Sequence, residues 1–308
     1  MRIDVLDLGS NTFHLASFRI AETLRPLASA KAPTRLGEHA FQHGFIDDRS
    51  ARRALESIGR LLAEVRPGRE EERLVAIATG VFRDATNAGD FLASVRRRYG
   101  IDVQILSGEA EAELTYAGVR SEMPDPDARL AVFDLGGGSL EIACGRGERV
   151  SLSRSLPMGV LRMNRRWRDA ADGTRLLRDA VRDAVEPMTR AIRRFEPDEI
   201  VFSAGTARAL LRLARRLEMP EDVPGCLGRQ TLFQLAMLLT PLDADAVESL
   251  GVPASRADTI GTGAVILSTV VELMQVPFVR IARRALREGV ALAAADQKEL
   301  RGLTWISV

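Results

Sequence analysis

The sequence predicts an α/β fold of two related domains, because one strand–loop–strand pattern occurs twice. Near the N-terminus, an apolar run ends in Asp7-Leu8-Gly9, and a second apolar run starts at Phe13. The same tripeptide returns in the middle of the chain as Asp134-Leu135-Gly136, again between two apolar runs. Repetition of such a unit indicates two related domains that face each other across a cleft. Short apolar strands that alternate with longer helical patterns predict mixed sheets flanked by helices.

The central copy of the pattern carries residues suited to phosphate. Three glycines, Gly136 to Gly138, allow a tight turn whose backbone N–H groups no Cβ obstructs. Successive N–H groups in such a turn form a nest for anions. Asp134, at the strand end, supplies hard oxygen ligands for the Mg²⁺ that accompanies a polyphosphate. A flexible hairpin turn without a ligand is the plain alternative for one such loop, but the second copy makes it the minority interpretation.

Length, net charge and composition limit the classes of protein to which this chain can belong. The chain has 308 residues, enough for two domains, expected at 1–124 and 125–308 with the polar stretch 121–128 as linker. The net charge of +1 predicts neither a nucleic-acid nor a membrane partner. The longest apolar run, Ile260 to Met274, contains Glu272 and is too short to span a bilayer, so it predicts a buried helix. Two cysteines and no signal-peptide pattern favour a cytoplasmic protein.

In the first half of the chain, apolar spacing predicts the elements of a mixed sheet with helices. Strands are expected at 14–20, 24–31, 74–78 and 102–106. Helical spacing begins near Ser50, and Pro67-Gly68 ends that helix. Asn87 is a suitable cap for a helix that Gly100 ends, and Ser107 is a suitable N-cap for the next one.

The helix after Ser107 contains a candidate catalytic base. Glu109, Glu111 and Glu113 crowd its first turns, where the helix dipole favours carboxylates, and this accounts for Glu109 and Glu113. Glu111 points away from the apolar stripe of this helix. A carboxylate near a helix start at a strand end is where an active-site base can sit.

In the second half, the same pattern continues with longer helices. Strands are expected at 149–155, 199–202 and 278–282, and helices at 161–195, 207–217, 260–274 and 285–300. Asp172-Gly173 divides the first of these helices in two. Gly205 and Thr206 form a third glycine turn before a helix, and helix N-termini attract anions. Arginine clusters such as 162–168 are interpreted mainly as solvated faces, although those beside the cleft could bind a polyanion.

Taken together, the motifs resemble the exopolyphosphatase and guanosine pentaphosphate phosphohydrolase (Ppx/GppA) family, within the actin–sugar kinase–heat-shock-ATPase superfamily. The matching pieces span Asp7 to Val290. They read DLGSNTFHL, TRLGE, ATGVFRDATN, ILSGEAEAELTYAGV, FDLGGGSLEI, LPMGVLRM, SAGTARAL and ALREGV. The resemblance implies two actin-like (ribonuclease H-like) domains in a short, two-domain form. It also implies release of a terminal phosphoryl group with the help of Mg²⁺ or, alternatively, Mn²⁺.

The resemblance assigns roles to residues of both halves. Glu111 matches the catalytic base. Asp134 and Glu141 match metal-associated carboxylates. Asp7, at the equivalent strand end of the first copy, is expected as a third metal residue. Phosphate or substrate contacts are expected from Ser10, Asn11, Arg83, Gly137, Gly138, Ser139, Gly205 and Thr206. Two positions depart from the family pattern, since Ala110 replaces a glutamate and Ala285 a glycine.

We therefore expect a cytoplasmic exopolyphosphatase that releases orthophosphate from inorganic polyphosphate, with a preference for short chains. A guanosine pentaphosphate phosphohydrolase is the first alternative, because that substrate presents the same terminal phosphoanhydride. A kinase of the same superfamily and a non-catalytic sensor of guanosine polyphosphates are the others. A homodimer is left open.

Overall fold

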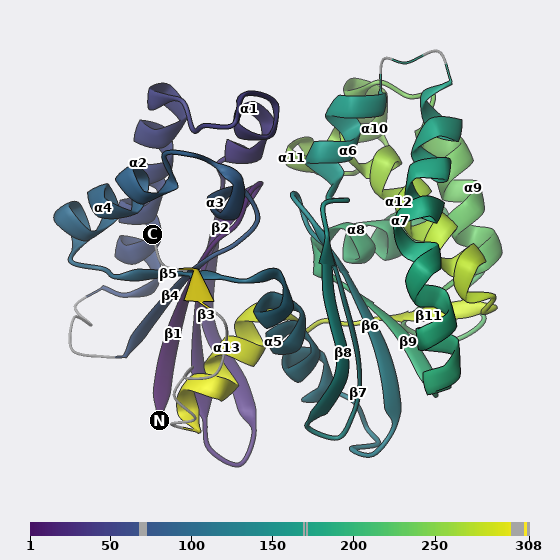
Figure 1. Cartoon of the computed structure of the whole chain (residues 1–308), viewed down its shortest axis with the longest axis horizontal. Coiled ribbons are helices and arrows are strands. Elements are labelled where there is room, and N and C mark those ends of the chain that lie inside the picture. The colour runs from purple at the N-terminus through teal and green to yellow at the C-terminus, as the bar shows by residue number, and fades with distance from the viewer. Residues whose placement is uncertain (68–72, 169, 171, 297–304, 307–308) are drawn as a thin grey trace. The chain divides into compact units, whose positions relative to one another are not determined.

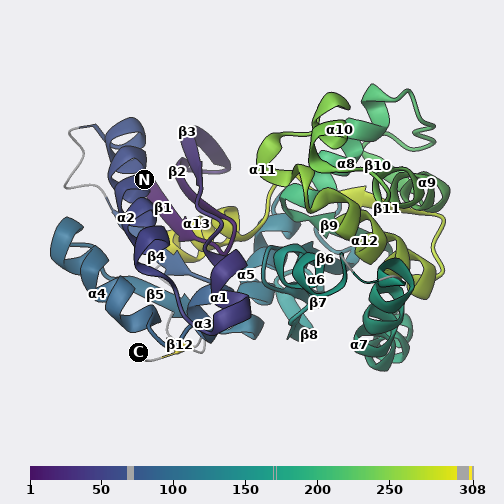
Figure 2. The ribbon, with the colours of Figure 1, turned by 90° about the horizontal axis from the view of Figure 1, so that it is seen from above.

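The computed structural model describes residues 1–67, 73–168, 170, 172–296 and the backbone of 305–306. The chain forms two compact units (Figures 1 and 2). Unit 1 comprises Met1–Gly118 together with Arg284–Val308, and unit 2 comprises Val119–Arg283. No helix in the described part of the chain is both long enough and apolar enough to cross a membrane.

Unit 1 is built on a six-stranded mixed sheet in the order β12-β5-β4-β1-β2-β3. The strands are β1 (Arg2–Leu8), β2 (Thr12–Ile20), β3 (Leu24–Pro33), β4 (Leu74–Ala78), β5 (Val103–Leu106) and β12 (Trp305–Ile306). The first three form an antiparallel meander, while β4 and β5 add in parallel. The helices are α1 (Leu36–His43), α2 (Asp48–Val65), α3 (Val81–Asp84), α4 (Ala88–Tyr99), α5 (Gly108–Arg120) and α13 (Leu286–Ala295).

Unit 2 repeats this plan with the order β10-β11-β9-β6-β7-β8. The strands are β6 (Arg129–Leu135), β7 (Leu140–Arg146), β8 (Arg149–Leu156), β9 (Glu199–Ser203), β10 (Cys226–Gly228) and β11 (Phe278–Ile281). The helices are α6 (Val160–Trp167), α7 (Gly173–Phe195), α8 (Ala204–Arg216), α9 (Arg229–Leu239), α10 (Ala244–Ser249), α11 (Ala254–Ala257) and α12 (Ile260–Met274). Here too, an antiparallel meander is extended by two parallel strands.

The repeated hairpin of the sequence is confirmed residue by residue. In unit 1, Leu8 pairs with Phe13, so a four-residue loop begins at Gly9. In unit 2, Leu135 pairs with Leu140 across a loop of the same length. The two sheets therefore present equivalent loops at equivalent strand ends, as the repeated tripeptide predicted.

Helices cover each sheet with apolar residues. In unit 1, Leu6 and Leu8 pack with residues of α2 and α4, and Ile3 and Val5 pack with residues of α5 and α13. In unit 2, Phe133 and Phe202 pack edge to face at 5.7 Å between ring centroids. The apolar run 260–274 forms α12, which lies in the core and confirms the buried helix.

The C-terminal helix gives a division of the chain that differs from the expected 1–124 and 125–308. Helix α13 belongs to unit 1, because its apolar side packs on β1 with Val290 and Ala291 fully buried. The helix expected at 285–300 ends at Ala295, and residues 297–300 lie outside the described part. The short strands β10 and β12 were not expected, since three and two residues carry no periodic signal.

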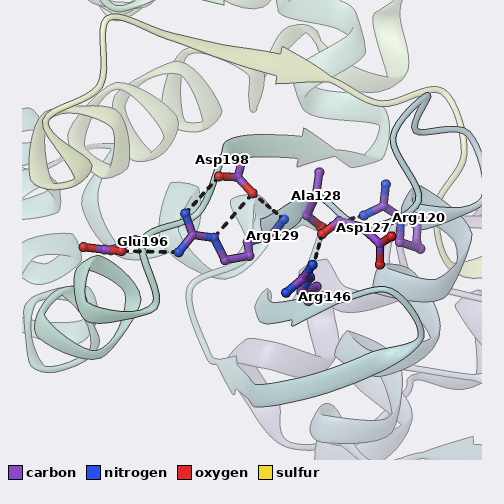
Figure 3. A network of polar contacts seen from close by, with 7 residues as sticks. All are labelled: Arg120, Asp127, Ala128, Arg129, Arg146, Glu196 and Asp198. Carbon is purple, nitrogen blue, oxygen red and sulfur yellow. Dashed lines mark hydrogen bonds and ion pairs between the residues drawn. The ribbon is translucent and has the colours of Figure 1, made fainter.

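The stretch expected as a linker, 121–128, is held at an ordered corner of unit 2 by arginines (Figure 3). Arg120 donates to the carbonyl of Ala128 at 2.8 Å, and Arg146 donates to that of Asp127 at 3.1 Å. The next residue, Arg129, forms ion pairs of 3.0 Å with Asp198 and 3.3 Å with Glu196. Hydrogen bonds from Arg129 lower the pKa of Asp198. Two prolines and a polar composition thus mark a fixed turn here.

Candidate active site

The first glycine loop of unit 1 is fixed by backbone and side-chain hydrogen bonds. The Ser10 hydroxyl oxygen accepts the N–H of Val81 at 2.9 Å, where α3 begins. The Ser10 carbonyl accepts the N–H of Gly37 at 2.9 Å. Ser10 is 5% exposed, so its hydroxyl is ordered and retains its own proton to donate. The Asn11 side-chain oxygen is buried and accepts from no group in the described part of unit 1, which leaves it available to a ligand or water.

The candidate base lies at the start of α5, as predicted. The Ser107 hydroxyl accepts the N–H of Ala110 at 3.1 Å, which confirms Ser107 as the N-cap. Glu111 is 7% exposed and forms an ion pair with Arg83, with 2.6 Å between Oε2 and Nη1. The same Nη1 donates to the carbonyl of Leu106 at the end of β5. The structure therefore brings together Glu111 and Arg83, two predicted site residues from distant parts of the sequence.

Ala110 lies in the apolar core, with 2% of its surface exposed. It packs in the cluster that includes Val5, Leu114 and Leu286. A glutamate at this position would have to bury its carboxylate or displace the helix. The alanine at this departure from the family pattern is therefore accommodated by apolar packing.

Asp7 is associated with an arginine that the sequence did not single out. Arg287 of α13 lies 3.4 Å from the Asp7 carboxylate, and Asp7 is 8% exposed. His14 is the cross-strand partner of Asp7, so both side chains point to the same face of the sheet. The ALREGV motif contains Arg287, but nothing in that stretch alone indicated the strand end that it would reach.

In unit 2, two predicted carboxylates lie side by side on neighbouring strands. Asp134 and Glu141 are direct cross-strand partners on β6 and β7. Asp134 accepts a hydrogen bond from the Ser203 hydroxyl, and Glu141 accepts one from the Ser155 hydroxyl at 2.7 Å. Both carboxylates are buried, with 8% and 2% exposed. Like charges opposite each other repel, so this pair favours the presence of a cation.

The glycine loop that follows Asp134 forms a tight turn. The N–H of Gly136 donates to the Ser139 carbonyl at 3.0 Å. The N–H groups of Gly137 and Gly138 donate to no protein group within the residues that the structure describes. Ser139 is buried at the end of the turn. The loop therefore has the backbone donors that the sequence predicted for phosphate.

The two residues of the third glycine turn, Gly205 and Thr206, have different surroundings. Thr206 is 3% exposed, and its methyl group packs against Gly263, where an added Cβ would lie 2.4 Å from it. Gly205 lies against the guanidinium of Arg256, which a Cβ would approach to 2.0 Å. Burial, with smaller contributions from Arg208 and Arg212, lowers the pKa of Arg256 to about 10, so it stays charged at neutral pH. Sequence reasoning missed Arg256, because a single arginine in a short helix gives no local signal.

The predicted site residues thus form one set in each unit. Unit 1 contains Asp7, Ser10, Asn11, Arg83 and Glu111. Unit 2 contains Asp134, Gly137, Gly138, Ser139, Glu141, Gly205 and Thr206. Among the described residues, no group of three or more histidine, cysteine or carboxylate side chains is arranged to hold a metal. A cation at Asp134 and Glu141 would therefore take further ligands from substrate or water.

Comparisons with known proteins identify the family of the chain. A family model described as the Ppx/GppA phosphatase family matches residues 18–298. Exopolyphosphatase 1 of Mycobacterium tuberculosis (strain H37Rv) is 34% identical over 97% of this chain and 89% of its own length. The protein of the same name from Mycobacterium leprae is 32% identical over 97% of this chain and 91% of its own length.

Solved structures show the same fold. A crystal structure of an exopolyphosphatase from Cytophaga hutchinsonii matches with a TM-score of 0.85 and 24% identity, covering 96% of this chain and 98% of that one. The Aquifex aeolicus member of the Ppx/GppA family matches with a TM-score of 0.75 and 22% identity, covering 97% and 99%.

The duplicated mixed sheets and their strand-end loops define a protein of the actin-like ATPase fold, as predicted. Within that class, the chain belongs to the Ppx/GppA phosphatase family. Its class of reaction is therefore phosphoanhydride hydrolysis.

Proposed function

We propose that this protein is an exopolyphosphatase that removes the terminal phosphate from short chains of inorganic polyphosphate. The buried ion pair between Glu111 and Arg83 is the observation that carries the proposal. A carboxylate held in one orientation suits a general base, and a neighbouring guanidinium suits an anionic substrate. The name exopolyphosphatase, carried by relatives at 34% and 32% identity, supports polyphosphate as a substrate.

The proposed reaction is in-line attack of water on the terminal phosphorus. Glu111 accepts a proton from the water as its oxygen bonds to phosphorus, and the bridging P–O bond breaks. The products are orthophosphate and a chain shorter by one phosphate. Arg83 donates to the phosphate, so that substrate competes with Glu111 for the guanidinium. Within unit 2, the amides of Gly137 and Gly138 are suited to donating to phosphate oxygens.

A divalent cation, Mg²⁺ or alternatively Mn²⁺, fits the paired carboxylates Asp134 and Glu141. Carboxylate oxygens are the ligands that these hard cations prefer, and the two side chains share one face of the sheet. When bound, the cation neutralises negative charge on phosphate oxygens. Asp7, whose carboxylate lies 3.4 Å from Arg287 in unit 1, stays a proposed metal-associated carboxylate. Two free buried cysteines support the expected cytoplasmic location.

One assay tests the proposal against its alternatives. Phosphate release is measured side by side from tripolyphosphate, long-chain polyphosphate, guanosine pentaphosphate and ATP, with Mg²⁺ and no acceptor. We expect the highest kcat/KM for tripolyphosphate. A clear preference for guanosine pentaphosphate would replace the proposed substrate with the alternative. Binding without release would indicate a sensor, and release only after addition of an acceptor would indicate a kinase.

A further inference from the structure

The glycine loop between β6 and β7 is held along its length by the first turn of α6. Three donors at the start of this helix bind three successive carbonyls of the loop. They pair in order: Val160 N–H with the Gly136 oxygen at 3.0 Å, Leu161 N–H with the Gly137 oxygen at 2.9 Å, and Arg162 Nε with the Gly138 oxygen at 3.1 Å. The free N–H groups of a helix start are thus satisfied by the loop.

This pairing fixes the direction of the loop amides. In a planar trans peptide, a carbonyl and the N–H of the following residue point in opposite directions. The carbonyls of 136–138 point at α6, so the amides of Gly137, Gly138 and Ser139 point away from it. Successive amides that share a direction form an anion-binding nest. The helix therefore sets the direction of the loop amides, which include those of Gly137 and Gly138 that were predicted to bind phosphate.

Gly159 allows this close approach. It immediately precedes α6, and its backbone conformation (φ −67°, ψ 153°) is one that any residue adopts. A Cβ at this position would nevertheless lie 2.3 Å from the carbonyl carbon of Gly138 and from the nitrogen of Ser139. Real Cβ atoms do not approach backbone that closely, so a side chain here would push the loop off the helix.

In unit 1, the glycine loop is likewise held by hydrogen bonds from the start of α1. There, α1 follows β3 just as α6 follows β8, and the N–H of Gly37 donates to the Ser10 carbonyl at 2.9 Å. The N–H of Arg35 donates to the Asn11 carbonyl at 3.0 Å. Backbone groups hold that loop, whereas Gly138 is held by the side chain of Arg162. Substitution of Arg162 can therefore remove its hydrogen bond to the Gly138 carbonyl without altering the backbone.

We propose that Gly159 and Arg162 are positioning residues of the phosphate-binding loop. Gly159 lets the loop lie on α6, and Arg162 orients the Gly138–Ser139 peptide through the Gly138 carbonyl. We assign this role to the Nε–H donor of Arg162 and not to its positive charge. The consequence for phosphate affinity rests on the proposed function, whereas the consequence for loop geometry does not.

Two substitutions of Arg162 separate the donor from the charge. In Arg162→Gln, the amide nitrogen lies the same number of bonds from Cα as the arginine Nε, so the donor remains and the charge is lost. Arg162→Met has similar length and no donor. We expect Arg162→Met to raise KM for tripolyphosphate about five-fold with little change in kcat, as for loss of one hydrogen bond. We expect Arg162→Gln to stay within about two-fold of wild type. Equal damage in both variants would show that the charge matters and would overturn the inference.

Two controls keep the result specific. Arg166 is exposed on the same helix, with its guanidinium over the ring of Trp167, and Arg166→Met should leave KM unchanged. Gly159→Ala should raise KM further than Arg162→Met, and thermal unfolding reports whether it still folds.

A measurement without substrate tests the loop geometry directly. The ¹⁵N resonance of Ser139 is recorded in the free protein, because loss of the bond to the Gly138 carbonyl perturbs the next amide. We expect a shift in Arg162→Met and the wild-type position in Arg162→Gln. An unshifted resonance in Arg162→Met would overturn the inference even in an active enzyme. A wild type that releases no phosphate would overturn the proposed function and leave this measurement valid.

Discussion

Gly118 on α5 and Gly289 on α13 face each other so closely that neither position has room for a side chain. A Cβ on Gly118 would lie 1.9 Å from the Ala285 carbonyl oxygen and 3.0 Å from the Gly289 nitrogen. A Cβ on Gly289 would lie 1.8 Å from the Leu114 carbonyl oxygen and 3.1 Å from the Gly118 nitrogen. The contact is reciprocal, and it lets α13 settle against α5 in unit 1.

Substitution at this contact should destabilise unit 1. We expect Gly289→Ala to lower the free energy of unfolding by about 1–3 kcal/mol, the usual cost of overpacking. Urea unfolding followed by circular dichroism measures this. Gly228→Ala is the matched control, because a Cβ there meets only the Thr231 hydroxyl at 3.6 Å. Equal stability of Gly289→Ala and wild type would show that the helices separate without cost.

Glu111→Gln should lower kcat by about 10²–10⁴-fold, the usual contribution of a general base. Glutamine keeps the shape and an oxygen that accepts from Arg83, so KM should change little. Steady-state phosphate release measures both constants. Glu109→Gln on the same helix should be near wild type, since Glu109 is exposed at the first turn. Retention of activity in Glu111→Gln would remove it as the base.

Removal of the divalent cation should abolish phosphate release, and added Mg²⁺ should restore it. We expect Asp134→Asn to raise the Mg²⁺ concentration for half-maximal activity at least about ten-fold, because a neutral amide is a weaker ligand than a carboxylate. Asp127→Asn, an exposed position in the same unit, serves as control. Activity that a chelator does not affect would contradict the assignment of these carboxylates to a cation.

Asp47 should make stability depend on acid pH. Hydrogen bonds from Ser50 lower the pKa of Asp47 below its usual 3.8, and Asp47 caps α2 by accepting the Ser50 N–H at 2.9 Å. A group with a lowered pKa stabilises the fold above its unfolded value, and the contribution is lost as pH falls through the folded value. Asp47→Ala should therefore cost ~1 kcal/mol at pH 7 and progressively less below pH 3.8. Urea unfolding across this range, with Asp48→Ala as control, measures the difference.

Both thiols should be unreactive in the folded protein. Burial raises the pKa of Cys144 to about 12 and also raises that of Cys226. Since the thiolate is the nucleophile, neither should react with a disulfide reagent at pH 8 until the chain unfolds. Counting reactive thiols with and without urea checks this. Rapid labelling of the native protein would mean that one of the two sites opens.

Local patterns predicted the elements that local interactions determine. Ser107 was identified as an N-cap from the chemistry of one residue, and its hydroxyl does accept the N–H of Ala110. Asn87 was expected to cap α4 in the same way. Its side chain instead forms two 2.8 Å hydrogen bonds with the backbone of Ile46, far away in the sequence. Residues adjacent in the sequence do not indicate tertiary contacts of this kind.

The residues of the candidate site fall into the same two groups: those that a local pattern predicted, and those that only tertiary contacts define. Glycine loops and strand-end carboxylates were found because their spacing repeats. Arg287, Arg256 and Arg162 were grouped among solvated arginines or passed over, although they contact Asp7, Gly205 and Gly138. An arginine side chain is long enough to act several residues from its own position, so only the folded structure shows what it touches.

The return of α13 to unit 1 also sets an order for synthesis on the ribosome. Every residue of unit 2 leaves the ribosome before α13 does, so unit 2 can complete its core while unit 1 still lacks a helix. Until then, Ile3 and Val5 on β1 lack the apolar partners that α13 supplies. A nascent chain paused in this interval would expose an apolar sheet face, the kind of surface that chaperones bind.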